Sequence, residues 1–178
     1  MELNFDFTRK LPIGIQDFED LRTNGYLYVD KTAYIYRLLH TGKPYFLGRP
    51  RRFGKSLFLS TLKAFFLGKK EIFEGLAIAQ LEKDWTKYPV LYLDFNSGSF
   101  DDGTASLRST LANFLRNAEK EWDYSSDDDN LGVRFANLIR CASEKSNRKV
   151  VVLIDEYDKP LLNMMDNEEE QKKMRAML

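Results

Sequence analysis

Apolar and polar positions alternate along the chain in a way that predicts strands followed by helices. Apolar runs at residues 45–47, 90–93 and 150–154 have the length and composition of short buried strands. Apolar residues at helical spacing follow two of these runs, over residues 55–67 and 107–122. This order is typical of an α/β protein with a mainly parallel sheet, in which the last strand is buried on both faces.

Residues 45–62 form the clearest strand, loop and helix pattern. The apolar run 45–47 is interrupted by Gly48 and Pro50, and a helical pattern begins with the Gly-Lys-Ser triplet at residues 54–56. A loop of this kind directs backbone N–H groups toward the start of a helix, where an anion is favoured by roughly 0.3 to 2 kcal/mol. The junction therefore predicts a phosphate site.

The triplet matches the second half of the phosphate-binding pattern G-x-x-x-x-G-K-[ST]. Arg49 stands at the position of the first glycine, and Gly48 lies one residue too early. In this interpretation Lys55 binds the outer phosphates and Ser56 a Mg²⁺ ion, and the backbone forms the cradle. The expected cofactor-binding residues are Arg52, Phe53, Gly54, Lys55, Ser56 and Leu57. A basic surface turn before a core helix is the alternative.

A second motif follows the apolar run 150–154. Asp155 and Glu156 come directly after it, at the edge of an α/β sheet where ligands bind. Asp155 suits a role near Mg²⁺ beside Ser56, and Glu156 suits a base that orients the attacking water. Without the Gly-Lys-Ser loop, the two carboxylates would more simply cap a helix. Asp94 also ends an apolar run, but no glutamate follows it, which makes it a weaker candidate.

Four motifs together resemble the bacterial and archaeal predicted AAA-ATPase-like family. They are the segments LPIGIQDF at 11–18, YVDKT at 28–32, RPRRFGKSL at 49–57 and LIDEYDKPL at 153–161. The resemblance covers nearly the whole chain, and Arg49 agrees with the family's own form of the loop. It implies a P-loop NTPase fold of three α/β/α layers, ATP and Mg²⁺ as ligands, and ATP hydrolysis with Lys55 and Glu156 as catalytic residues.

The same resemblance sets expectations for organisation and partners. Residues 1–43 are expected to be a leader that packs on the core, and residues 44–178 the N-terminal part of the ATPase core. The strand between the 45–47 strand and the 150–154 strand, with its sensor residue and the lid, comes later in such proteins. We therefore expect a fragment of a longer ATPase, and whether it hydrolyses ATP alone stays open. Family members commonly carry a C-terminal nuclease-like domain, which with a partner protein is the partner expected besides ATP.

Composition excludes some other functions. Lys plus Arg and Asp plus Glu number 27 each, so net charge gives no sign of nucleic-acid or membrane binding. One cysteine rules out an internal disulfide, and one histidine with it cannot form the usual zinc site. With neither an apparent membrane span nor a signal profile, we expect a cytoplasmic protein. The oligomeric state stays open.

Local signals predict several helix ends. Thr32 is expected to cap a helix reaching about His40, and Gly68 to end the helix that starts at Lys55. Asn167 and Glu170 form a capping-box pattern before a short C-terminal helix.

Two functions are compatible with these residues. The first is Mg²⁺-dependent ATP hydrolysis, with Glu156 as the base. The second is a slow or non-catalytic nucleotide switch that controls an attached effector such as a nuclease. Phosphate release distinguishes them.

Overall fold

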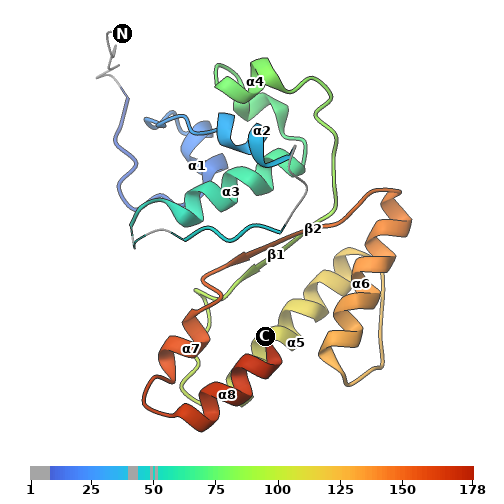
Figure 1. The fold of residues 1–178 in the computed structure, drawn as a ribbon. Helices are drawn as coiled ribbons and strands as arrows, with labels where there is room; N and C mark the ends of the chain where they lie inside the picture. The colour runs from blue at the N-terminus through green and yellow to red at the C-terminus, as the bar shows by residue number, and fades with distance from the viewer. Residues whose placement is uncertain (1–8, 40–43, 49, 51) are drawn as a thin grey trace. The chain divides into compact units, whose positions relative to one another are not determined.

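The computed structural model describes residues 9–39, 44–48, 50 and 52–178. The chain is mixed α/β and divides into two compact units, Met1–Lys87 and Tyr88–Leu178 (Figure 1). Each unit is described by itself. Within the described residues, no helix has both the length and the apolar character needed to cross a membrane.

The first unit is helical. Its elements are α1 (Phe18–Thr23), α2 (Ala33–Leu39), α3 (Lys55–Phe66), the 3₁₀ helix η1 (Lys70–Phe73) and α4 (Ala77–Leu81). Its core combines aliphatic and aromatic side chains, and within it Phe73 packs its ring on both Phe18 and Trp85, with ring centroids 4.8 and 5.2 Å apart. Gly68, with φ 70°, follows Leu67, the C-cap residue of α3, which confirms the predicted helix end.

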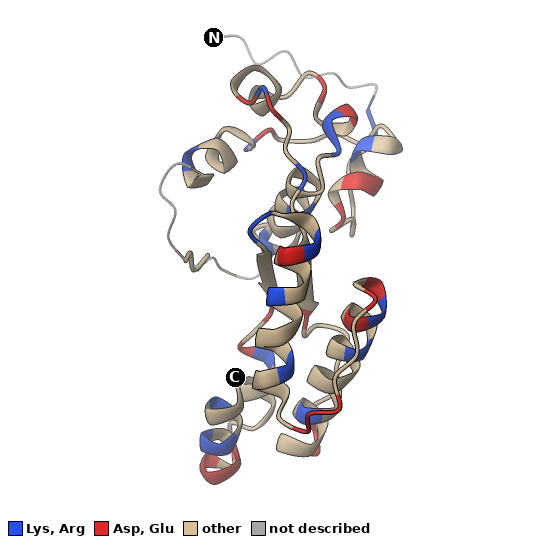
Figure 2. Cartoon of the chain, turned by 90° about the vertical axis from the view of Figure 1, so that its right-hand side faces the viewer, with Lys and Arg blue, Asp and Glu red and all other residues tan. Residues whose placement is uncertain are grey.

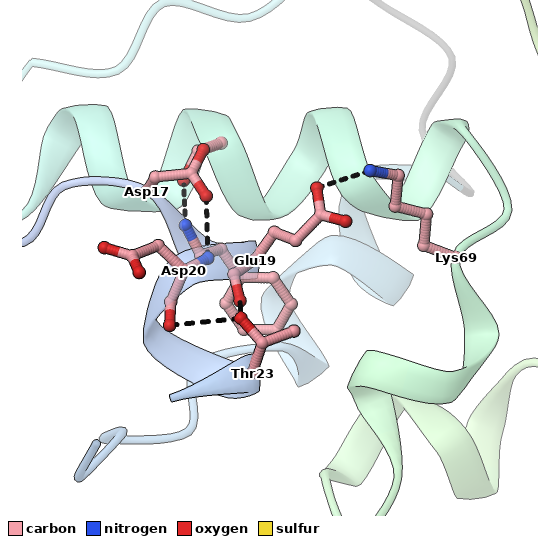
Figure 3. A network of polar contacts seen from close by, with 7 residues as sticks. Asp17, Glu19, Asp20, Thr23 and Lys69 are labelled. Atoms are coloured by element: carbon pink, nitrogen blue, oxygen red, sulfur yellow. Dashed lines mark hydrogen bonds and ion pairs between the residues drawn. The ribbon is translucent and has the colours of Figure 1, made fainter. Parts of the chain in front are cut away.

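Polar contacts fix α1 to the segment that follows α3 (Figure 3). Asp17 caps α1 by accepting a hydrogen bond from the backbone N of Asp20 at 2.9 Å. Lys69 forms an ion pair with Glu19. The ion pair thus holds α1 to the segment that follows α3.

Thr32, which the sequence predicts as the cap of the helix that starts at Ala33, contributes its side chain to the cap of α4. Its Oγ1 accepts a hydrogen bond from the N of Ile78 at 3.1 Å, and Asp30 Oδ2 accepts one from Ala77 at 2.7 Å. Asp30 Oδ1 in turn accepts both the N and the Oγ1 of Thr32. The residue at the N-cap position of α4 is Leu76, which offers no acceptor, so two residues from the YVDKT motif supply the acceptors instead.

The strand predicted at residues 45–47 does not form. These residues have no regular secondary structure, and Tyr45 and Phe46 are 53% and 75% exposed. A strand needs a neighbour to satisfy its backbone groups, and the sheet of the described residues has only two strands, both elsewhere.

The second unit contains that sheet. Its elements are β1 (Val90–Asp94), α5 (Thr104–Glu121), α6 (Leu131–Ser146), β2 (Val151–Asp155), α7 (Lys159–Asn163) and α8 (Glu168–Met177). The strands are parallel, and their register runs from Val90 opposite Val151 to Asp94 opposite Asp155. The described sheet is smaller than the expected mainly parallel sheet, and α5 and α6 form the connection between its strands.

The expectation that β2 is buried on both faces was wrong. Val152 and Ile154 are 38% and 46% exposed, although they lie opposite the buried Leu91 and Leu93 of β1. Leu91 packs with residues of α5 and α6, and Leu93 packs with residues of α5 and α8. These helices thus cover β1, and β2 keeps one apolar face exposed.

The predicted capping box at α8 forms only in part. Asn167 Oδ1 accepts the N of Glu170 at 3.1 Å, as expected for an N-cap. Glu170 does not reach back to Asn167. Its Oε1 accepts the N and Oγ1 of Thr104 at 2.8 and 2.6 Å, at the start of α5, where Gly103 has no side chain to cap the helix. The acidic first turn of α8, seen in red in Figure 2, therefore serves a second helix.

Candidate functional site

The junction before α3 has two left-handed residues, the backbone feature from which anion nests are built. Arg52 and Gly54 both have left-handed backbones, with φ 67° and 71°. Alternation of left-handed residues with their neighbours turns successive N–H groups toward one concave side, which favours an anion. Arg52, Phe53 and Gly54 are all exposed. Arg49 and Arg51, which the sequence also offers for this loop, lie outside the described residues.

The first turn of α3 continues this array of donors. The first intrahelical bond runs from the N of Phe58 to the O of Gly54 at 3.0 Å, so the N–H groups of Lys55, Ser56 and Leu57 precede the hydrogen-bonded part of the helix. The N-cap is Gly54, and no side chain caps the helix. An anion in front of this turn would meet both free donors and the positive end of the helix dipole.

Ser60 fixes α3 to the N-terminal segment, and sequence reasoning missed it. Its Oγ accepts the N of Phe18 at 2.9 Å and lies within hydrogen-bond distance of the O of Gln16 at 3.1 Å. Ser60 follows Ser56 by four residues, so the two lie on the same side of α3. The LPIGIQDF motif is thus anchored one turn beyond the predicted phosphate site, a link that no local pattern reveals.

Tyr28 from the YVDKT motif packs beside the same helix. Its side chain is bonded to Thr61 of α3, and burial raises the pKa of its phenol. Position in the sequence makes Tyr28, Val29 and Thr32 candidates for a base-binding pocket. The contacts of Thr32 are structural, since it is fully buried against α4, and Val29 is 70% exposed.

The carboxylates after β2 lie in the second unit. Asp155 is only 6% exposed, and its Oδ1 accepts the N of Glu156 at 3.0 Å. Glu156 itself has φ 51°, a conformation that costs a residue with a side chain about 1 to 2 kcal/mol. Strain of this kind persists where the surroundings hold it, and it concentrates at functional sites.

Asp94 belongs to the same edge of the sheet. It is the register partner of Asp155, so the two aspartates end adjacent parallel strands. Its Oδ1 accepts the N of Asn96 at 2.7 Å. From the sequence, Asp94 is the weaker candidate because no glutamate follows it. The signal in its favour is that both aspartates lie at the same distance from the starts of their strands.

The predicted site residues therefore fall into two groups. The cradle, Arg52 to Leu57, is in the first unit, and Asp155 and Glu156 are in the second. That the two groups meet around one ligand stays a prediction. Across the described part of the chain, no three His, Cys, Asp or Glu side chains gather in a way that could hold a metal ion.

Comparison with known proteins identifies the family. The sequence profile described as "Predicted AAA-ATPase" matches residues 12–178, which is almost the whole chain. The chain belongs to this family. The resemblance stated from the four motifs is thereby confirmed, and membership supports nucleotide binding.

A curated relative comes from Azotobacter chroococcum mcd 1. It is an uncharacterized protein in the vnfD 5′ region, 41% identical over 169 residues, which cover 94% of this chain. The match covers 32% of that protein, so the chain spans about a third of its relative's length. No solved structure matches the chain.

Proposed function

We propose that this chain is part of a P-loop ATPase core that binds ATP with Mg²⁺ and hydrolyses it. Lys55 neutralises the outer phosphates, and the backbone N–H groups of residues 52–57 surround them. Ser56 and Asp155 hold the metal ion, directly or through water. Glu156 takes the proton of the attacking water, which makes it and Lys55 the catalytic pair.

The observation that carries the proposal is the nest at the start of α3. Two left-handed residues, Arg52 and Gly54, lead into a helix with no side-chain cap, whose first turn carries both an ammonium and a hydroxyl group. Phosphate is the anion that this combination of donors suits best, because its oxygens accept several N–H hydrogen bonds and at the same time form an ion pair with an ammonium group. Family membership favours the same ligand.

The residues present also fit a magnesium ion. Ser56 offers a hydroxyl oxygen and Asp155 a carboxylate, and hard oxygen ligands in small number are what Mg²⁺ takes beside substrate phosphates. The ion would supply charge neutralisation on the phosphate oxygens. The chain's own contribution is to hold Asp155 buried and Glu156 beside it, with the Glu156 backbone fixed by the Asp155 carboxylate.

A second candidate is a nucleotide-dependent switch with slow or no turnover. The length of the curated relative favours it, since about two thirds of that protein lies outside the match and provides room for an effector. A C-terminal nuclease-like domain or a separate partner protein would be that effector. The switch uses the same cradle, so binding alone does not separate the two functions.

The test measures Mg-ATP binding and phosphate release for the intact protein that contains this chain. Lys55→Ala should abolish binding. Glu156→Gln should keep ATP affinity and lower turnover by about 100 to 10,000-fold, the contribution of a general base. Lys70→Ala and Glu121→Gln are the matched controls, because both side chains are exposed and lie outside the proposed site. The controls should behave as wild type.

The outcomes separate the proposals. Turnover that depends on Glu156 supports the ATPase. Tight binding without turnover in the wild type supports the switch. If the wild type binds no ATP, or if Lys55→Ala binds as tightly as Lys70→Ala, the cradle is not a nucleotide site.

A further inference from the structure

The loops that follow β1 and β2 are joined by a continuous set of hydrogen bonds. Asp94 Oδ1 accepts the N of Asn96 at 2.7 Å, and the O of Asn96 accepts a bond from the Lys159 ammonium. The backbone N of Lys159 donates to the O of Glu156 at 3.0 Å. The N of Glu156 donates to Asp155 Oδ1 at 3.0 Å, so the set runs from the end of one strand to the end of the other.

Lys159 has a central place in this set because it bonds both loops. Its backbone closes the turn that starts at Glu156, and its side chain crosses to the loop after β1. Lys159 is also the first residue of α7, so its backbone position is fixed by that helix. A partly buried lysine that donates to a neutral carbonyl, rather than to a carboxylate, holds two backbones together without neutralising a charge.

The turn held in this way contains the strained Glu156. With φ 51°, Glu156 leaves β2 in a direction that an extended residue would not take. The N–H of Glu156 donates to the Asp155 carboxylate, and its carbonyl accepts a bond from the backbone N–H of Lys159, so both sides of the strained residue are fixed. If the turn opened, Glu156 would relax toward the extended backbone of the strand, and its carboxylate would point elsewhere.

We propose that Lys159 is a positioning residue for Glu156, which it holds in the orientation needed to activate water. The inference rests on the proposed ATPase function, in which Glu156 is the base. Lys159 lies outside the cradle of residues 52–57 and outside the proposed metal ligands, so its role is in the rate of hydrolysis and not in ATP affinity. Misplacing a catalytic group by about 1 Å lowers a rate by about 100-fold.

The experiment compares Lys159→Met, Lys159→Arg and the wild type in the intact protein. Methionine keeps most of the aliphatic chain and removes the donor, and arginine restores a donor of similar reach. Single-turnover hydrolysis, ATP affinity and amide hydrogen exchange of residues 94–98 and 155–160 are measured for each. Lys120→Met, an exposed lysine on α5, is the control. Lys159→Met is also combined with Glu156→Gln.

We expect Lys159→Met to hydrolyse ATP about 10 to 100-fold more slowly than the wild type, with ATP affinity changed less than about threefold. Its amides at 94–98 and 155–160 should exchange faster, and Lys159→Arg should recover most of the rate. In the Glu156→Gln background, Lys159→Met should lower the rate no further, because the group that it positions is already gone.

Three results would overturn the proposal. The first is wild-type exchange in Lys159→Met, which would mean that the side chain does not hold the loops, whatever the protein does with ATP. The second is faster exchange with an unchanged hydrolysis rate. The third is a lowered rate of equal size in the Glu156→Gln background. If the wild type itself does not hydrolyse ATP while exchange responds as expected, the ATPase function fails and the link between the loops stands.

Discussion

Glu119 and Arg134 join α5 to α6 through two parallel hydrogen bonds. The Nε of Arg134 donates to Glu119 Oε1 at 2.9 Å, and its Nη2 donates to Oε2 at 2.7 Å. Glu119 is 6% exposed, so its charge is removed from water. Hydrogen bonding to Glu119 raises the pKa of Arg134, so the guanidinium keeps its charge. The pair fixes the two helices that connect β1 with β2.

Removing the glutamate should leave a half-buried arginine without its partner. We expect Glu119→Ala to lower the free energy of unfolding by about 3 kcal/mol, as for other buried pairs from which one member is removed. Glu121→Ala, two residues later and exposed, should change it by less than about 0.5 kcal/mol. Urea denaturation followed by circular dichroism measures both. Equal stabilities for the two variants would show that the pair contributes nothing.

The cap of α4 gives a second prediction. Asp30 accepts the N of Ala77 and also holds Thr32, which accepts the N of Ile78. Asp30→Ala removes the first acceptor and loosens the second, so we expect a loss of about 1 to 2 kcal/mol. Asp84→Ala, an exposed aspartate of the same unit, is the control. Thermal unfolding measures both variants. Equal melting temperatures for the two would contradict the prediction.

A third prediction concerns pH. Hydrogen bonds from the Thr104 hydroxyl, and then from its backbone N, lower the pKa of Glu170 below its ordinary value of 4.5. A carboxylate with a lowered folded-state pKa stabilises the fold above the unfolded-state pKa, and the stabilisation is lost as pH falls through the folded-state pKa. The melting temperature of the wild type should therefore decrease when the pH is lowered below about 4.5.

Glu170→Gln provides the comparison, because its amide oxygen can still accept from Thr104 but does not titrate. The gap in melting temperature between the wild type and this variant should be largest near neutral pH and should shrink as the solution becomes acidic. A gap that stays constant with pH would mean that the charge of Glu170 has no part in holding the start of α5.

Local signals predicted local structure well. The helix that begins at Lys55 and stops before Gly68, the strands that end at Asp94 and Asp155, and the Asn167 cap all follow from residues within a few positions of one another. Capping and periodicity act over one or two turns, so one sequence contains what is needed to find them.

Contacts between distant segments were not predicted. Thr32 and Glu170 stand where caps of their own helices are expected, yet the side chain of each accepts a hydrogen bond from the start of a distant helix. Thr32 accepts from Ile78, 46 residues away, and Glu170 accepts from Thr104, 66 residues away. The N-cap residues of these distant helices, Leu76 for α4 and Gly103 for α5, have no side chain that can accept a hydrogen bond. This lack of an acceptor can be recognised in the sequence only once the start of the helix is known. The exposed face of β2 has a similar origin, because burial of a strand depends on its neighbours.

Glu156 provides the last prediction, since its backbone can be tested separately from its carboxylate. Ala and Gly variants both remove the carboxylate, but only glycine adopts φ 51° without strain. Glycine also gains entropy in the unfolded chain, worth about 0.5 to 1 kcal/mol against it. Asn147, which has the same φ of 51° at the end of α6 and no proposed chemistry, calibrates both effects.

We expect Glu156→Gly to be more stable than Glu156→Ala by about 1 kcal/mol, as at Asn147, and neither Glu156 variant to hydrolyse ATP. If glycine is no better than alanine at Glu156 but is better at Asn147, the strain at the end of β2 is absent in solution, and the orientation of the carboxylate needs another explanation.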